Sequence, residues 1–249
     1  MTIFVSYPTG CYPRYQKEDQ VETQLGQKHV AGRHNGPRPV QSAAWTSCIT
    51  PYAALTFDDG PDPLWMPRIL DALDRVAVRA TFFVIAPLAL EHRQLVYDTL
   101  DAGHEIEFHC TEHVRHTRRS RRAVEVDTRE GLQALRSLGI EPQLWRTPWG
   151  VYAPWTREVA VNFGLRLASW SADTKDWRGD TVPEMFGRIV PLLGPGSVVL
   201  MHDGLGPGAR RTGCRETVAL VEPLVAHLRE IGCEPTPLGL AVGEKGVVT

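Results

Sequence analysis

Residues 53–61 read Ala-Ala-Leu-Thr-Phe-Asp-Asp-Gly-Pro, an apolar run that ends in two adjacent carboxylates and a turn. The same pattern, an apolar run followed directly by a polar side chain, recurs along the chain. The polar residues that end these runs are Asp58, Asp59, His109, Arg146, Asp173 and His202. In a sheet of parallel strands such positions share the carboxyl-terminal edge, where barrel enzymes carry their active sites. The pattern therefore predicts an active site at one edge of a parallel sheet.

From Ala53 onward, short apolar runs alternate with amphipathic segments. The predicted strands are 53–57, 80–85, 104–108, 143–146, 165–170 and 197–201. Helices are expected between them, because apolar residues recur there at three- and four-residue spacing. Glycines that would cap these helices stand at Gly103, Gly139, Gly164 and Gly232. Strand and helix in alternation predict an α/β fold, a distorted parallel barrel of about seven strands.

Residues 1–50 lack clear periodicity and are rich in Gln, Gly, Pro and charged residues. They are predicted to form an irregular N-terminal extension with one strand at 3–7, while residues 51–249 form the catalytic domain. The N-terminus lacks the basic and apolar regions of a secretory signal, which favours a cytoplasmic location.

The composition of the chain narrows its class. With 249 residues, of which 43% are hydrophobic and 22% charged, it can bury one large core. A formal net charge of −2 gives no general attraction to nucleic acid or membrane, and no run of 18 apolar residues exists. Five cysteines without a Cys-x-x-Cys pair indicate neither a disulfide framework nor a zinc knuckle. The sequence leaves the oligomeric state open.

Adjacent carboxylates at a strand end suit divided roles. Successive side chains diverge on an extended backbone, so Asp58 and Asp59 cannot perform one task together. One carboxylate can bind a cation while the other accepts a proton from water. On its own, an Asp-Asp-Gly sequence is more typical of a solvated turn, and it is the other motifs of the chain that favour a functional role.

His109 and His113 supply two imidazoles at i and i+4, which would meet on one side of a helical turn. Together with an aspartate they can hold one divalent ion and leave positions open for water and substrate, as catalytic metal sites do. Cys110 is expected to be a small packed residue, and Glu112 and His116 are candidates for groups that support the ligands.

Five segments resemble, in the same order, the motifs of the polysaccharide deacetylase family with the NodB homology domain (carbohydrate esterase family 4). They are Thr56-Phe57-Asp58-Asp59-Gly60, His109-x-x-x-His113, Arg146-x-Pro148-Trp149-Gly150, Asp173-x-x-Asp176-Trp177 and Leu200-x-His202-Asp203. The resemblance covers roughly residues 52 to 240.

The resemblance implies that Asp59, His109 and His113 hold a divalent metal, most often zinc, with cobalt or nickel as alternatives. It implies that Asp58 is the general base for an attacking water and that Arg146 orients it.

For the general acid, the resemblance implies that His202 protonates the leaving nitrogen and that Asp173 keeps His202 charged. The backbone N–H of Trp149 would stabilise the oxyanion, and Trp177 and Leu200 would wall a pocket for the acetyl methyl. Cys110, Val114 and Trp149 stand at positions where members of this family often have other residues. These differences concern the shape of the groove, and so the choice of substrate, rather than the presence of activity.

The implied function is a metal-dependent N-deacetylase that releases acetate from an N-acetylated amino sugar, such as a chitooligosaccharide, a peptidoglycan-type glycan or a glycoconjugate. One alternative is a deacylase of a small-molecule biosynthetic intermediate. Another is a carbohydrate-binding protein without activity, which the set of acid and base residues disfavours.

Two further groups of side chains bear on the substrate. Residues 115–122 carry five arginines, typical of a solvated helix start but also able to clamp a phosphate or carboxylate through Arg115, Arg118 or Arg119. The tryptophans expected to stack on sugar rings are Trp65, Trp149, Trp155 and Trp177, and those expected in the core are Trp145 and Trp170.

Overall fold

The computed structural model describes residues 51–242. The predicted N-terminal extension, with its strand at 3–7, lies outside the described residues. Within the described part, no helix is both long and apolar enough to cross a membrane.

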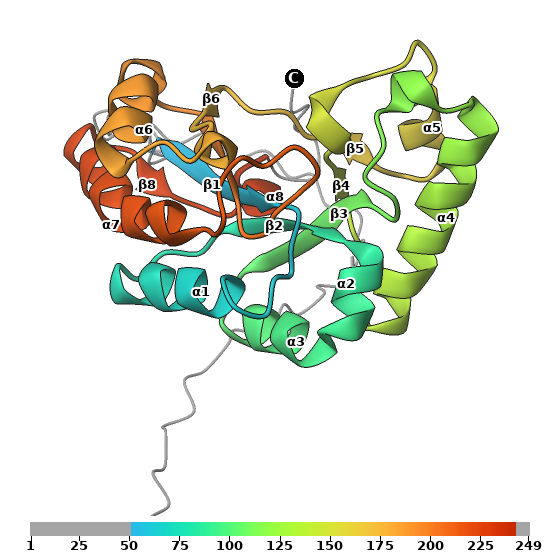
Figure 1. Ribbon diagram of the computed structural model, residues 1–249, viewed down its shortest axis with the longest axis horizontal. Helices are drawn as coiled ribbons and strands as arrows, with labels where there is room; N and C mark the ends of the chain where they lie inside the picture. The colour runs from blue at the N-terminus through green and yellow to red at the C-terminus, as the bar shows by residue number, and fades with distance from the viewer. Residues whose placement is uncertain (1–50, 243–249) are drawn as a thin grey trace, which may run out of the picture. The chain divides into compact units, whose positions relative to one another are not determined.

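The described residues fold around a sheet in which every strand pair is parallel (Figure 1). Its strands are β1 (Tyr52–Asp58), β2 (Thr81–Ile85), β3 (Glu105–Cys110), β4 (Leu144–Trp145), β5 (Arg166–Leu167), β6 (Ala172–Asp173), β7 (Ser197–His202) and β8 (Glu234–Pro235). Seven of them follow the order β5-β4-β3-β2-β1-β7-β6, and β8 pairs with β1. Strands β5 and β6 end this order without pairing to each other, so the curled sheet stays open. The predicted distorted parallel barrel is confirmed.

All six predicted strands are present, but β4 and β5 are much shorter than expected. After Leu167 the chain leaves the sheet, and the carbonyl of Ser169 accepts a hydrogen bond from Arg146 instead of a neighbouring strand. Strands β6 and β8 have two residues each, too few to give a periodic signal in the sequence.

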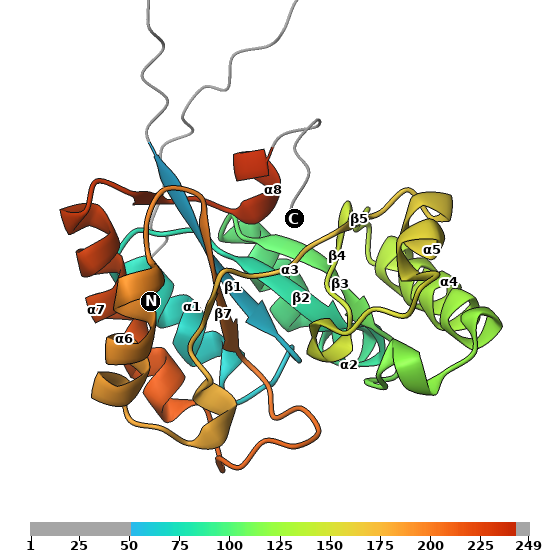
Figure 2. The same cartoon turned by 90° about the horizontal axis from the view of Figure 1, so that it is seen from above.

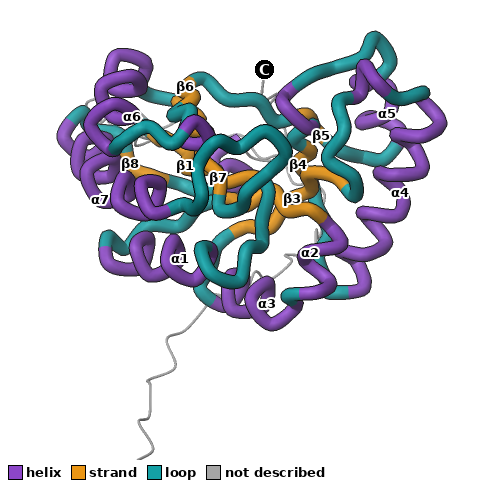
Figure 3. Tube along the Cα trace, in the orientation of Figure 1, coloured by secondary structure: helices purple, strands orange, loops and turns teal. Residues whose placement is uncertain are grey.

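Helices cover the outer surface of the sheet (Figures 2 and 3). They are α1 (Met66–Arg75), α2 (Ala86–Glu91), α3 (Arg93–Asp101), α4 (Arg121–Ser137), α5 (Thr156–Asn162), α6 (Val182–Ile189) and α7 (Arg215–Glu230). The short helix α8 (Leu238–Val242) lies on the other side of the sheet, where Leu238 packs in the smaller apolar cluster. Short 3₁₀ turns are η1 (His116–Arg118), η2 (Pro148–Gly150), η3 (Asp176–Arg178) and η4 (Val190–Leu192). The four predicted capping glycines all have left-handed φ angles, between 72° and 83°. Such angles favour glycine, which ends a helix without steric cost.

Successive side chains of β1 point to opposite faces of the sheet, and polar side chains lie on the inner face, which is the face away from the helices of the main core. On β1, Leu55 and Phe57 pack into the main core beneath the helices, while Ala54 faces a smaller apolar cluster on the other side of the sheet. Side chains two residues apart share a face of a strand, so Thr56 and Asp58 continue the inner face begun by Ala54. The inner face therefore changes from apolar to polar at the carboxyl end of β1.

Glu107, on the same inner face of β3, joins β3 to β4. Its Oε2 accepts the backbone N–H groups of Gln143 at 2.8 Å and Leu144 at 2.7 Å. Burial raises the pKa of Glu107 from 4.5 to about 7, although these two N–H donors act in the opposite direction. Glu107 thus fixes the strand that precedes Arg146.

This raised pKa predicts a pH-dependent stability. The folded state binds the Glu107 proton more tightly than the unfolded state, so the contribution is full below about pH 4.5 and is lost as the pH rises through about 7. The stability of the wild type relative to Glu107→Gln should therefore fall between pH 5 and pH 8, by up to about 3 kcal/mol. Urea unfolding of both proteins at the two pH values measures the difference. A difference that does not change with pH would contradict the assignment.

Candidate active site

The two adjacent aspartates face different partners. Asp58 ends β1, and its Oδ1 accepts a hydrogen bond from Arg146 Nη1 at 2.8 Å. Asp59 follows with a left-handed φ of 75°, an uncommon backbone conformation for a residue other than glycine. Its Oδ1 lies near two imidazole nitrogens, at 3.4 Å from His109 Nε2 and 3.2 Å from His113 Nε2. The carboxylates diverge, as their adjacency on a strand end predicts.

Asp59, His109 and His113 form a cluster whose ligand atoms all lie within 4.8 Å of one another. Ligands at 2.0–2.2 Å from a tetrahedral ion are about 3.4 Å apart, close to the two separations found here. The donor set therefore fits one divalent ion.

The hydrogen-bonding state of His109 supports the same conclusion. Its Nδ1 lies 2.6 Å from the carbonyl oxygen of Arg146, which can only accept, so Nδ1 carries a proton and Nε2 is the nitrogen left to bind a metal. His109 Nε2 and Asp59 Oδ1 are buried without a hydrogen-bond partner. Burial disfavours the charge of Asp59, yet contacts with the two histidines hold its pKa well below the usual range. A buried, charged carboxylate beside two imidazoles is suited to a cation.

The two histidines meet for a reason other than the predicted helical turn. Strand β3 continues through Cys110, the chain then bends, and no helical residue occurs before His116. The bend is held by Asp127 on α4, which accepts the backbone N–H groups of Thr111 at 3.1 Å and Glu112 at 2.9 Å. The i, i+4 spacing identified the right pair, but the helical turn predicted for it is wrong.

The neighbours of the histidines do not support the ligands directly. Cys110 is buried and lies outside the cluster, as predicted. The exposed carboxylate of Glu112 pairs with Arg119. His116 packs on Trp155, and burial lowers its pKa to about 4. Glu112 and His116 therefore do not have the supporting role expected from the sequence.

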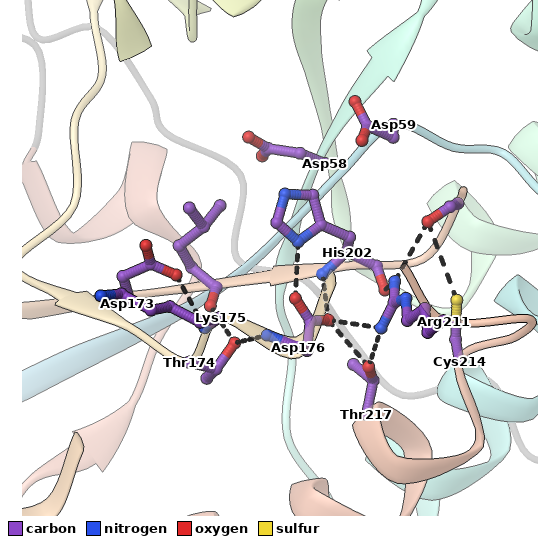
Figure 4. A network of polar contacts seen from close by, with 12 residues as sticks. Asp58, Asp59, Asp173, Thr174, Lys175, Asp176, His202, Arg211, Cys214 and Thr217 are labelled. Carbon is purple, nitrogen blue, oxygen red and sulfur yellow. Dashed lines mark hydrogen bonds and ion pairs between the residues drawn. The ribbon is translucent and has the colours of Figure 1, made fainter. Parts of the chain in front are cut away.

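His202 lies beside Asp58, because the two residues are paired in register at the ends of β7 and β1. Its Nδ1 is 2.7 Å from Asp176 Oδ1. Burial acts against the imidazolium, but the Asp176 carboxylate raises the pKa of His202 to about 9. Figure 4 shows the other ring nitrogen facing Asp58 and Asp59. A proton donor and a carboxylate thus flank the Asp-His-His cluster.

The partner expected for His202 was Asp173, and this expectation is wrong. Asp173 ends β6, lines the pocket, and accepts the backbone N–H of Lys175 through Oδ1 at 2.8 Å. Lys175 has a left-handed φ of 56°, and the turn η3 then begins at Asp176. This turn brings Asp176, rather than Asp173, into contact with His202.

Two residues that the sequence analysis did not identify hold Asp176 in place (Figure 4). Asp176 Oδ2 accepts hydrogen bonds from Arg211 Nη1 at 2.8 Å, Thr217 Oγ1 at 2.8 Å and the backbone N–H of His202 at 3.0 Å. Arg211 Nη2 also donates to the carbonyl oxygens of His202 and Gly204. Burial opposes the charge, but the charge and hydrogen bond of the His202 ring, followed by Arg211 and Thr217, lower the pKa of Asp176 to about 2. Arg211 and Thr217 lie in a loop and at the start of α7, where no periodic pattern identifies them.

A cavity of about 400 Å³ opens above these side chains. Its walls include Trp149, Trp177 and Leu200, as the resemblance implies, and also Trp170, which was expected in the core. Trp149 is 37% exposed and lies edge-on to His113 at 4.2 Å between ring centroids.

The remaining tryptophans lie away from this cavity. Trp145 is buried in the core, as predicted. Trp65 precedes α1 and stacks with Arg68, whereas Trp155 packs on His116. The sugar-stacking role expected of Trp65 and Trp155 therefore has no support in their positions.

Comparison with known proteins places this arrangement in a family. The sequence profile of the family described as polysaccharide deacetylase matches residues 49–168. A chitooligosaccharide deacetylase of Sinorhizobium fredii is 32% identical over 188 residues, which cover 73% of this chain and 87% of the relative. A peptidoglycan-N-acetylglucosamine deacetylase of Bacillus cereus is 33% identical over 181 residues, which cover 72% of this chain and 82% of the relative.

This chain belongs to the polysaccharide deacetylase family. A family 4 carbohydrate esterase from Streptomyces lividans, solved in complex with acetate, superposes with a TM-score of 0.68 at 28% identity. The superposition covers 79% of this chain and 95% of that protein. The polysaccharide deacetylase profile ends at residue 168, so Asp176, His202 and Arg211 lie beyond the matched segment.

The loop after β7 closely approaches Asp59, the candidate metal ligand. A Cβ atom on Gly204 would lie 2.4 Å from the carbonyl oxygen of Asp59, a backbone atom that cannot move without shifting the ligand. Gly204→Ala should therefore weaken metal binding by about 10- to 100-fold, the usual effect of disturbing the surroundings of a ligand. Gly187→Ala, where a Cβ meets nothing within 4 Å, is the matched control. Metal titration followed by calorimetry measures both, and equal affinities would rule out this constraint.

Proposed function

We propose that this polysaccharide deacetylase hydrolyses the acetamide of an N-acetylated amino sugar and releases acetate. One observation carries the proposal: a candidate general base and a candidate general acid lie on the neighbouring strands β1 and β7, beside the Asp-His-His cluster. The base is Asp58, which is paired with Arg146, and the acid is His202, which is paired with Asp176. The substrates in the names of the two relatives, chitooligosaccharide and peptidoglycan N-acetylglucosamine, support an N-acetylated glycan.

Asp58 acts as the general base in this proposal. Arg146 is fully buried and binds Asp58 Oδ1, which keeps the carboxylate in one orientation and leaves its second oxygen to accept a proton from the attacking water. Arg146 Nη1 also donates to Thr56 Oγ1 at 2.7 Å, so the guanidinium is itself fixed.

Asp59, His109 and His113 would hold a divalent ion. Two imidazole nitrogens and a carboxylate oxygen are a donor set that zinc favours, which supports zinc as the native metal. When bound, such an ion polarises the substrate carbonyl and makes water more acidic.

His202 acts as the general acid. The amine leaves poorly unless its nitrogen is protonated, and His202 faces the cluster as an imidazolium up to about pH 9. Asp176 fixes the ring and its charge, so the proton is delivered from the nitrogen that faces the cavity. The proton that Asp58 takes from water and the proton that His202 gives to nitrogen balance the hydrolysis.

The cavity walls would select the acetyl group and the sugar. Leu200 and Trp177 offer an apolar surface to the acetyl methyl, and the backbone N–H of Trp149 donates to the oxygen that becomes negative in the transition state. The exposed ring of Trp149 gives a face on which a sugar can stack.

Asp58→Asn separates proton transfer from metal binding. The variant should still bind one metal ion per chain through Asp59, His109 and His113, but should lose about 10²- to 10⁴-fold in turnover, the usual contribution of a general base. Acetate release from chitooligosaccharides measures turnover, and metal analysis measures occupancy. Asp71→Asn, on the exposed side of α1, is the control and should retain full turnover. Near-wild-type turnover of Asp58→Asn would assign the base to another residue.

The pH dependence of activity tests the acid pair. His202 must be protonated, and its raised pKa means that activity persists above its ordinary value of 6.5 and falls as the pH rises through about 9. Asp176→Asn removes the carboxylate that raises this pKa, so the basic limb should move to lower pH. Asp173→Asn should move it less, because Asp173 does not contact His202. Profiles of kcat/KM against pH for the wild type and both variants measure these shifts. A larger shift for Asp173→Asn than for Asp176→Asn would show that Asp173, rather than Asp176, raises the pKa of His202.

A further inference from the structure

The arginine-rich segment 115–122 divides into residues that stabilise the protein and one that faces the active site. Ser120 caps α4, and Arg121 binds Glu125 and Glu158, each at 2.7 Å. Arg119 pairs with Asp127 at 3.0 Å. These contacts belong to the start of α4 and agree with its interpretation as a solvated helix start.

Arg115 differs from the other arginines in the segment. It lines the same cavity as Asp58 and His113. Its guanidinium carbon lies 4.7 Å from the ring centroid of Trp149, whose ring contacts His113. Among the described residues, the side chain of Arg115 makes no ion pair or hydrogen bond, although it lies one aromatic ring away from a candidate metal ligand.

Stacking on Trp149 leaves the guanidinium able to bind an anion. The guanidinium lies over the ring, and a contact of this kind does not use the N–H donors, which lie in the plane of the group and stay available. Two of these donors match two oxygens of a carboxylate or phosphate in a bidentate contact. Stacking also restricts the side chain before a ligand arrives, which lowers the entropy lost on binding.

The other charges of the cavity already have partners. Asp58 binds Arg146, Asp59 lies against the two histidines, and His202 binds Asp176. The remaining carboxylate is Asp173 on β6, which accepts the backbone N–H of Lys175. Strand β6 is not a neighbour of β4, the strand that precedes Trp149. Arg115 is therefore the cation of this cavity that is left for a substrate.

We propose that Arg115 and Trp149 form a subsite for an anionic substituent, a carboxylate or a phosphate, on the glycan whose acetamide is hydrolysed. The subsite rests on the proposed deacetylase function and narrows it to acidic N-acetylated saccharides. A neutral saccharide contacts only the ring of Trp149 in this subsite. An acidic saccharide also accepts hydrogen bonds from the guanidinium N–H groups of Arg115.

Matched probes isolate the charge. The first pair is an N-acetylglucosamine disaccharide whose neighbouring sugar carries a lactyl carboxylate, together with the methyl ester of the same compound. The second pair is an N-acetylglucosamine oligosaccharide with and without a 6-phosphate. Dissociation constants are measured by calorimetry on Asp58→Asn protein loaded with zinc, so that binding is read without turnover, and KM is measured on the active enzyme.

With Arg115 present, at least one acidic probe should bind about three- to tenfold more tightly than its neutral counterpart, the range expected for a partly exposed ion pair. Arg115→Gln should abolish this preference and leave the neutral probe unchanged. Arg118→Gln is the control, because Arg118 is exposed and does not line the cavity, and it should retain the preference. The pair that shows the preference identifies the anion as carboxylate or phosphate.

Three results would overturn the subsite: equal binding of acidic and neutral probes in both pairs, a preference that survives Arg115→Gln, or a preference that Arg118→Gln removes equally. The two proposals fail separately. An Arg115-dependent preference without acetate release would retain the subsite and reject the deacetylase, whereas acetate release without the preference would do the reverse.

Discussion

The buried guanidinium of Arg146 connects the parts of the active site. It has no exposure to solvent, and its donors reach Thr56 and Asp58 on β1 and the Ser169 carbonyl beyond β5. Its own carbonyl oxygen accepts a hydrogen bond from His109 Nδ1, so the same residue orients the proposed base and a candidate metal ligand. A buried charge is costly unless it is paired, and removing one partner leaves the other uncompensated. The position of Asp58 is therefore tied to the packing of the sheet.

The acid half of the site has a second buried arginine with a similar role. Arg211 binds Asp176, which binds His202, and also donates to backbone carbonyls of the loop that follows β7. The two halves differ in how they are anchored. Arg146 follows β4, the strand next to the edge strand β5, whereas Arg211 comes from a loop and is held together with Thr217 at the start of α7. The orientation of the proposed acid, His202, therefore depends on loop structure, and that of the proposed base, Asp58, depends on the strands.

The sequence predicted those parts of the fold and site that follow from strand periodicity. The six longer apolar runs, the glycines that end helices, and the polar residues directly after Phe57, Phe108 and Met201 all occupy the expected positions. What the sequence could not predict depends on left-handed turns and long-range contacts. The family resemblance assigned Asp173 to His202, but the turn that follows the left-handed Lys175 gives that contact to Asp176. Similarly, the partner that holds the His109–His113 bend, Asp127, lies on a helix 15 or more residues away.

Some residues of the site lie on strands and others in the connecting segments. This difference explains where the substrate preference can change while the buried groups of the site stay in place. Asp58, His109 and His202 lie in strands whose register fixes them to one another, so altering their positions would disturb the core. Arg115 lies in a segment between β3 and η1, lines the cavity, and is held there by the ring of Trp149. Replacing Arg115 therefore leaves the buried network intact, because no hydrogen bond of that network includes it. A charge that is adjacent to the reacting groups but mechanically separate from them is suited to selecting substrates.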